Sequence, residues 1–174
     1  IGTQNGVCRY DGYRLQTFRS GLNQPSLLLS NDVVCISENP DYYFFGTRKG
    51  LNLMDKRTFR IKTLPFHELN VGVKSIQTDR QGFVWIGTFQ RLVRLSPDLQ
   101  HCETFDDSPL PKTSVNSVYV DRSGQVWALF WEHGAWRYDS AKRQFVRLPR
   151  VGERNNPFCM LQDKNGRYWI ATWG

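Results

Sequence analysis

Apolar and polar residues alternate along most of this chain in short runs that end at turn residues. Four such runs, rich in β-branched and aromatic residues, follow one another in the middle of the chain: 73–78, 83–88, 91–95 and 102–105. A period near two in runs of this length favours β-strands, and the Asp-Arg-Gln-Gly and Ser-Pro-Asp segments between them favour tight turns. No helical periodicity of useful length is visible. The pattern predicts an all-β unit of four antiparallel strands.

The same unit recurs about every 42 residues. An Ile-Gly-Thr phrase or a weaker copy of it is centred on positions 2, 46, 87, 129 and 171. A repeat of roughly 40–45 residues built from short strands is typical of β-propeller blades. We therefore predict an all-β fold of four-stranded antiparallel β-propeller blades, a fragment of a larger propeller. The predicted boundaries are a partial blade at 1–30, blades at about 31–72, 73–114 and 115–155, and a partial blade at 156–174.

Residues that recur at equivalent positions are interpreted first as blade-forming. We expect Trp85, Trp127 and Trp169 to pack one blade against the next, and we expect fourth-strand aromatic residues at Phe18, Phe59, Phe105 and Phe145. The fourth copy departs from the pattern. Leu129 replaces the repeat glycine, and the second loop gains one residue. We therefore expect a less regular blade there, with a ligand-facing surface that has diverged from the other repeats.

The charge balance is basic, at +7 over 174 residues. The stretch from Arg137 to Arg154 contains six basic residues and only two acidic ones. This excess indicates either an anionic partner or a solvated sheet edge where Lys and Arg protect exposed strands from pairing. No run approaches the roughly 18 apolar residues of a membrane span, and no signal peptide is recognisable. Since the chain begins and ends inside repeats, we interpret it as part of a longer protein.

The four cysteines lie far apart at non-equivalent repeat positions, with no Cys-x-x-Cys pair: Cys8, Cys35, Cys102 and Cys159. This spacing does not favour a zinc site. Most have apolar neighbours, where a free cysteine acts as a small hydrophobic residue. We expect no disulfide within the chain, no metal and no cofactor.

The segment Val73–Arg94 follows the pattern V-x-x-I-x-x-D-x-x-G-x-x-W-I-G-T-x-x-x-L-x-R, and Gly-Val-Cys-Arg-Tyr-Asp-Gly occupies 6–12. Both resemble the two-component regulator propeller repeat. The resemblance implies a segment of the periplasmic sensor domain of a hybrid two-component histidine kinase of the kind found in Bacteroidetes. It implies that the whole protein is a homodimer in the inner membrane and that this segment belongs to its ectodomain. The segment would contact the rest of the ectodomain. It would have no enzymatic activity of its own and would bind no nucleic acid.

The loops between second and third strands differ in chemistry although their flanking strands agree. Loops on a rigid scaffold are common recognition sites. We predict ligand binding by the residues of these loops: Arg48, Lys49, Phe89, Gln90, Arg91, Trp131, Glu132 and His133. The loops that lead into the first strands share this end of each blade and carry Asn31, Asn70, Asn116 and Asn156.

Aromatic faces, amides and guanidinium groups suit an oligosaccharide. The excess of basic residues favours an acidic or sulfated one over a neutral one. By resemblance, the sensor would regulate polysaccharide-utilisation genes.

Two alternatives stay open. The blades are also compatible with a protein-interaction scaffold. They are compatible, too, with a propeller lyase or hydrolase, for which Glu132 and His133 form the one acid–base pair to test. A second convergent carboxylate or metal cluster is missing from the pattern, so catalysis is the weaker alternative.

Overall fold

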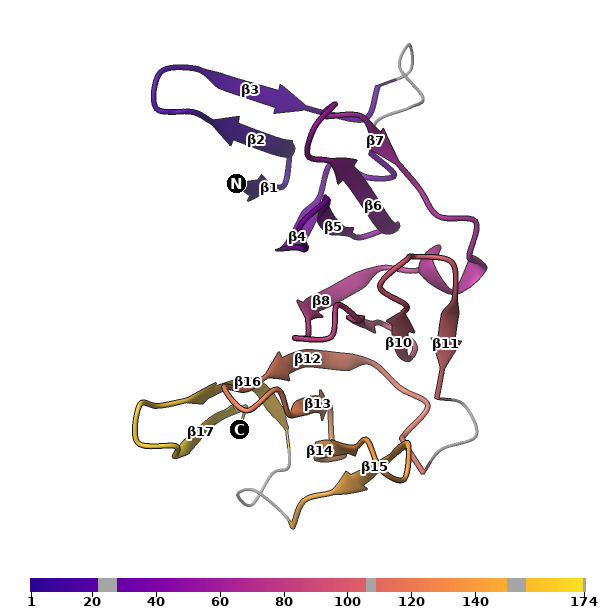
Figure 1. The fold of residues 1–174 in the computed structure, drawn as a ribbon, viewed down its shortest axis with the longest axis vertical. Helices are drawn as coiled ribbons and strands as arrows, with labels where there is room; N and C mark the ends of the chain where they lie inside the picture. The colour runs from indigo at the N-terminus through magenta and orange to yellow at the C-terminus, as the bar shows by residue number, and fades with distance from the viewer. Residues whose placement is uncertain (22–27, 106–108, 150–155, 174) are drawn as a thin grey trace. The chain divides into compact units, whose positions relative to one another are not determined.

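The computed structural model describes residues 1–21, 28–105, 109–149 and 156–173 (Figure 1). The all-β prediction is confirmed in these residues. Their one helix is the 3₁₀ helix η1 (His67–Leu69), and no helix in this part of the chain is long and apolar enough to cross a membrane. The chain divides into two compact units, Ile1–Ile76 and Gln77–Gly174, which are described separately.

The described strands form five antiparallel sheets, each ordered as the strands follow in the chain. The first sheet contains β1 (Gly2–Thr3), β2 (Gly6–Tyr10) and β3 (Leu15–Phe18). The second contains β4 (Val33–Glu38), β5 (Tyr42–Thr47), β6 (Gly50–Asp55) and β7 (Ile61–Lys62). The third contains β8 (Val73–Thr78), β9 (Val84–Thr88), β10 (Leu92–Leu95) and β11 (Cys102–Thr104). The fourth contains β12 (Val115–Val120), β13 (Val126–Phe130), β14 (Gly134–Asp139) and β15 (Gln144–Arg147). The fifth contains β16 (Pro157–Gln162) and β17 (Tyr168–Thr172).

The threonine of the repeated phrase closes the loop between the second and third strands. The Thr47 hydroxyl donates to the carbonyl of Gly50 at 2.8 Å and accepts the backbone N–H of Lys49 at 3.2 Å. Thr3 and Thr88 close their own loops in the same way. The hydroxyl of each donates to the backbone carbonyl three residues later, at a distance of 2.8 Å. A side chain that satisfies turn backbone groups favours the turn, so this threonine fixes where each loop begins.

The glycine of the same phrase allows close approach of two sheets. A Cβ added to Gly87 would lie 2.9 Å from Val115 Cγ1 and 3.2 Å from the Val115 carbonyl oxygen, on the first strand of the following sheet. The fourth copy carries Leu129 instead, and the irregular blade expected there is not found. Strands β12–β15 pair as a complete sheet, and the fully buried Leu129 packs in one cluster with Met160 of β16. The first strand that follows begins with Pro157, where β12 begins with Val115.

Replacing Gly87 with alanine should destabilise the chain by about 1–3 kcal/mol, because the new methyl group overpacks the junction with Val115. Urea unfolding measures the change. Gly21→Ala is the matched control, since its Cβ would meet nothing within 4 Å. Adding Val115→Ala to Gly87→Ala should cost less than the sum of the two single changes. Strict additivity would show that the methyl group does not meet Val115.

Each turn between the first and second strands of the last three sheets is organised by an aspartate: Asp79, Asp121 and Asp163. In each, Oδ1 accepts the backbone N–H groups two and four residues later. Oδ2 accepts the indole N–H six residues later, at 2.7, 3.1 and 3.1 Å respectively. The glycine of each turn has φ between 81° and 88°, a region that disfavours other residues. The recurring Asp-x-x-Gly-x-x-Trp pattern is therefore one hydrogen-bonded unit.

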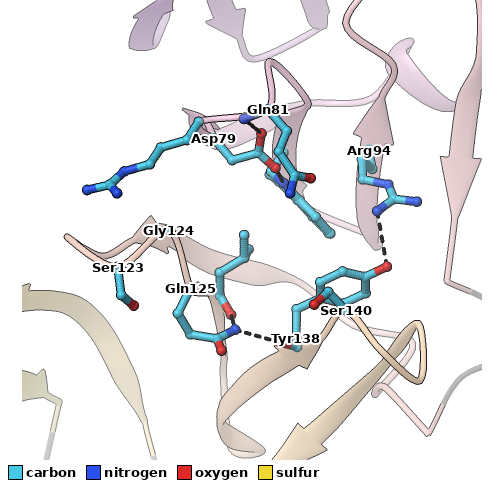
Figure 2. Close-up of a pocket in the computed structure, with 11 residues that line it drawn as sticks. Asp79, Gln81, Arg94, Ser123, Gly124, Gln125, Tyr138 and Ser140 are labelled. Atoms are coloured by element: carbon cyan, nitrogen blue, oxygen red, sulfur yellow. Dashed lines mark hydrogen bonds between the residues drawn. The ribbon is translucent and has the colours of Figure 1, made fainter.

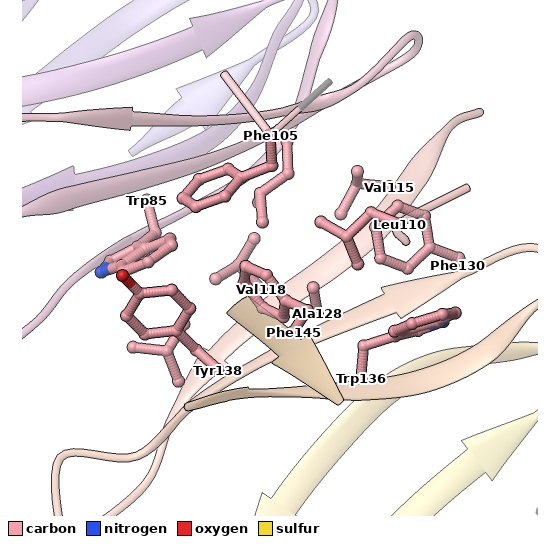
Figure 3. Packing of buried hydrophobic residues seen from close by; sticks show 12 residues of the cluster. Trp85, Phe105, Leu110, Val115, Val118, Ala128, Phe130, Trp136, Tyr138 and Phe145 are labelled. Carbon is pink, nitrogen blue, oxygen red and sulfur yellow. The ribbon is translucent and has the colours of Figure 1, made fainter. Parts of the chain in front are cut away.

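Two of these tryptophans, Trp85 and Trp127, pack one sheet against the next, as predicted. Trp85 is 1% exposed, stacks on Phe105 at 5.7 Å between ring centroids, and meets the edge of Tyr138 of the fourth sheet at 4.9 Å (Figure 3). The Trp127 ring lies 5.0 Å from that of Tyr168 on the fifth sheet. Trp169 is 60% exposed in the described structure.

Two of the four aromatic residues assigned to fourth strands lie off the strand, Phe59 by two residues and Phe105 by one. Phe59 does not lie on a fourth strand, because β7 begins only at Ile61. The Asp55 carboxylate accepts the backbone N–H groups of Arg57 and Thr58 and draws the chain into a turn in which Phe59 has φ 55°. There its ring lies 4.3 Å from the Arg9 guanidinium carbon. Phe18 and Phe145 do lie on β3 and β15, and Phe105 directly follows β11.

The four cysteines are free thiols. Burial raises the pKa of the Cys35 thiol to about 12, and a hydrogen bond with the Gly46 backbone opposes this only in part. Such a thiol is unreactive at neutral pH. Cys159 is exposed on β16 and does not fill a core position.

Candidate functional site

The loops predicted to bind ligand lie at the end of each sheet where the chain also enters the first strand. In the first unit this is visible at Arg48. Its backbone N–H donates to the carbonyl of Asp32 at 3.1 Å, and its Nε donates to the Asp32 carboxylate at 3.0 Å. Since Asp32 directly precedes β4, the ion pair ties the loop between β5 and β6 to the start of its own sheet. Lys49 is exposed beside it.

A basic residue that the sequence analysis missed lies near Arg48. Lys74 is half-buried on β8, and burial together with the positive charge of Arg48 lowers the pKa of its ammonium group. Two cations that raise each other's energy form a place where an anion is stabilising. The signal in the sequence was a lysine on a first strand where the equivalent residues are Val34, Asn116 and Phe158.

In the second unit the predicted loops present two exposed aromatic side chains. Phe89 is 41% exposed in the loop between β9 and β10, and Trp131 is 39% exposed in the loop between β13 and β14. Gln90, Glu132 and His133 are also exposed, whereas Arg91 is half-buried. Apolar rings held open to solvent on successive sheets can stack on the apolar faces of a ligand.

Three of the asparagines at the starts of the first strands hydrogen-bond to neighbouring segments. Asn31 Oδ1 accepts the Ser20 backbone N–H at 2.7 Å, and Asn156 Oδ1 accepts that of Glu132 at 2.9 Å. Asn116 lies on β12 and not in the loop before it, and its amide donates to the Pro157 carbonyl at 3.1 Å. Of these bonds, that of Asn156 reaches a loop predicted to bind ligand, at Glu132.

The acid–base pair proposed for catalysis is not assembled as a unit. Glu132 has φ 61° in the loop tip, and within the described ranges no hydrogen bond joins its side chain to that of His133. Among the residues that the structure describes, no three His, Cys, Asp or Glu side chains gather as a metal site requires.

The basic stretch near residue 140 follows the outer edge of the fourth sheet. Arg137, Lys142, Arg143 and Arg147 are exposed on or between β14 and β15, and Arg143 pairs with Glu103 at 3.5 Å. Residues 150–155, with the remaining charges of the stretch, lie outside the described residues. The described part matches a solvated, positively charged strand edge.

The second unit also contains a polar pocket of about 340 Å³, which lies between the third sheet (β8–β11) and the fourth sheet (β12–β15) of the chain (Figure 2). It opens near the turns between first and second strands, at the opposite end of the sheets from the predicted loops. Its polar lining is Asp79, Arg80, Gln81, Arg94, Ser123, Gln125 and Ser140. None of the eight residues predicted to bind ligand lines this pocket.

Arg94 is one of the residues that line this pocket. Its guanidinium donates to the Glu103 carboxylate, at 2.9 Å from Nε, and to the Tyr138 hydroxyl at 3.1 Å from Nη1. Its Cζ also lies 4.7 Å from the Phe83 ring and 5.1 Å from the Trp85 ring. The guanidinium charge is thus already paired with a carboxylate and aromatic rings, so Arg94 stabilises the junction of the two sheets.

Solved structures with the same fold include extracellular domains attributed to two component systems. The extracellular domain assigned to the hybrid two component system BT4673 of B. thetaiotaomicron is 22% identical, with a TM-score of 0.78, over 99% of this chain and 23% of that one. That of BT3049 from the same organism is 19% identical, with a TM-score of 0.80, over 98% and 25%. This chain thus spans about a quarter of either domain.

Virginiamycin B lyase from Staphylococcus aureus also shares the fold, at 12% identity and a TM-score of 0.75, over 97% of this chain and 57% of the lyase. No curated protein matches the chain. The family model described as "Two component regulator propeller" matches residues 67–90 and 153–174. The predicted resemblance to the two-component regulator propeller repeat is thereby confirmed for these two stretches of the chain.

Proposed function

We propose that this chain is a ligand-sensing, non-catalytic propeller segment in the periplasmic ectodomain of a hybrid two-component sensor. The observation that carries this proposal is the match of two of its repeats to the two-component regulator propeller. Fold similarity to two sensor ectodomains of B. thetaiotaomicron over nearly the whole chain supports it. The output would be a histidine kinase, in a homodimeric protein that regulates polysaccharide-utilisation genes.

The proposed ligand is an anionic oligosaccharide. Arg48 and Lys49, with Lys74 nearby, would pair with carboxylate or sulfate groups, because charge-assisted hydrogen bonds are roughly twice as strong as neutral ones. Exposed Phe89 and Trp131 would stack on sugar rings, with Gln90, Arg91, Glu132 and His133 as polar neighbours. A protein partner at the same loops, or a lyase reaction, would be the competing explanations.

Replacing Arg48 with alanine should weaken binding of an oligogalacturonate by about tenfold or more and flatten its salt dependence, because a charge-assisted contact is lost. Calorimetry at two salt concentrations measures both effects. Arg57→Ala is the charge-matched control, since Arg57 is exposed in the turn between β6 and β7, at the other end of the same sheet. A neutral galacto-oligosaccharide of equal length should bind both variants alike.

Equal losses in Arg57→Ala and Arg48→Ala would assign the effect to net charge and remove Arg48 from the site. Tight, salt-independent binding of the neutral sugar would contradict the anionic ligand. Turnover of either oligosaccharide would favour the lyase alternative. A protein pull-down without glycan binding would favour the scaffold.

A further inference from the structure

Two successive junctions between sheets in the second unit differ at one position. At the junction of the fourth and fifth sheets, Asp121 Oδ2 accepts the Trp127 indole N–H at 3.1 Å and the Tyr168 hydroxyl at 2.5 Å. At the junction of the third and fourth sheets, Asp79 Oδ2 accepts the Trp85 indole N–H at 2.7 Å. The position equivalent to Tyr168 is Val126, which has no hydroxyl group and a shorter side chain.

The polar pocket lies at the junction with the valine. Asp79 and Val126 both line its 340 Å³, and side chains from the third and fourth sheets face one another across it (Figure 2). In the part of the chain that the structure describes, no side chain donates a hydroxyl to Asp79 Oδ2 as Tyr168 does to Asp121. A carboxylate oxygen with remaining acceptor capacity therefore borders a cavity.

The other walls define the chemistry of an occupant. Trp85 is 1% exposed and Tyr138 7% exposed, so the rings at the base offer little apolar surface. Gln81 and Ser140 are exposed at the rim and supply amide and hydroxyl groups. The Gln125 amide N–H₂ donates to the Tyr138 carbonyl at 2.5 Å, which leaves its carbonyl oxygen as a further acceptor. These surroundings suit a hydrophilic molecule with several O–H donors.

We propose that this pocket binds a small polyhydroxylated molecule of mono- or disaccharide size, one of whose hydroxyl groups donates to Asp79 Oδ2. That hydroxyl would reproduce the contact of Tyr168 with Asp121 one repeat later. The volume of the pocket falls within the usual range for small-molecule sites. The site is separate from the loops proposed to bind an oligosaccharide, and it does not depend on that proposal.

Nuclear magnetic resonance of the ¹⁵N-labelled chain provides a direct test, because the Trp85 indole N–H is bonded to the same Asp79 oxygen. Titration with D-glucose, D-galactose, D-xylose, lactose and cellobiose should shift the Trp85 indole signal saturably for at least one sugar. The Trp127 and Trp169 indole signals should stay in place. Absence of any Trp85 shift up to the solubility limit of each sugar, or an equal shift at exposed Trp169, would overturn the proposal.

Two variants locate the sugar. Val126→Tyr places a phenol where Tyr168 stands in the next repeat and should weaken the sugar response by at least about tenfold. Ser140→Phe blocks the exposed rim without altering a core position and should do the same if the first variant fails to fold. Arg122→Ala is the control, since Arg122 is equivalent to Arg80 but does not line the pocket. An unchanged response in a folded blocking variant would contradict the proposed site.

Discussion

Replacing Trp85 with alanine is expected to destabilise the chain by about 3–5 kcal/mol, because a large side chain is lost from between two sheets. Trp85 is 1% exposed and contacts aromatic rings of both sheets, with centroids 5.7 Å away at Phe105 and 4.9 Å away at Tyr138. Alanine leaves a cavity between the sheets and removes the indole donor of Asp79. Urea unfolding followed by circular dichroism measures the loss.

Trp169→Ala is the matched control for this experiment. Trp169 occupies the equivalent repeat position and makes the same indole hydrogen bond, to Asp163 at 3.1 Å, but it is 60% exposed. Its replacement should cost less than about 1 kcal/mol, because little packing is lost at an exposed site. Similar losses at Trp85 and Trp169 would contradict the assignment of stability to packing between sheets.

This pair of tryptophans shows what the sequence could predict about the fold. Strand positions, turns and the 42-residue repeat were readable, because alternation and turn residues are local properties. The difference in burial between Trp85 and Trp169 was not, since both lie in nearly the same local phrase and burial depends on which sheet packs over them. The assignment of Phe59 to a fourth strand was wrong for a related reason. The Asp55 side chain accepts a backbone hydrogen bond in the turn, and β7 begins only after Phe59.

The candidate sites divide along the same line. The variable loops could be selected because they differ between repeats while their strands agree. Lys74 could not be selected from the sequence, because it occupies a strand position and its proximity to Arg48 arises only in the folded unit. The pocket at Asp79 depends on valine at 126 against tyrosine at 168, a difference that has meaning only once both are seen to face the preceding aspartate.

Replacing Asp121 with alanine should cost about 2–4 kcal/mol, since several charge-assisted hydrogen bonds to one nearly buried carboxylate are lost at once. Its carboxylate accepts the Ser123 hydroxyl at 2.6 Å, the Trp127 indole at 3.1 Å and the Tyr168 hydroxyl at 2.5 Å, and the residue is 4% exposed. Asp163→Ala removes the same turn at an exposed site and should cost less. Tyr168→Phe removes only the bond between sheets and should cost about 1 kcal/mol.

Asp121 and Tyr168 together should define a pH range in which their hydrogen bond stabilises the fold. Burial raises the pKa of Asp121, but the hydrogen bonds from Ser123, Tyr168 and Trp127 outweigh it and hold the pKa at about 2, below the ordinary 3.8. Its contribution is therefore present above pH 3.8 and lost as the pH falls toward 2. Partial burial and the bond to Asp121 raise the pKa of Tyr168 from 10.0 to about 12, so its contribution is present below pH 10 and lost as the pH rises toward 12.

Unfolding free energies of the wild type, Asp121→Asn, Tyr168→Phe and the double variant, measured across this pH range, isolate the interaction. The coupling between the two side chains should be largest between about pH 4 and 10, where the carboxylate is ionised and the phenol is protonated, and should shrink at both ends. Because Val126 stands at the equivalent position beside Asp79, the substitution Val126→Phe should show no such coupling with Asp79→Asn. A coupling at Asp121 that does not vary with pH would mean that the two side chains stabilise the junction by packing rather than by the charged hydrogen bond.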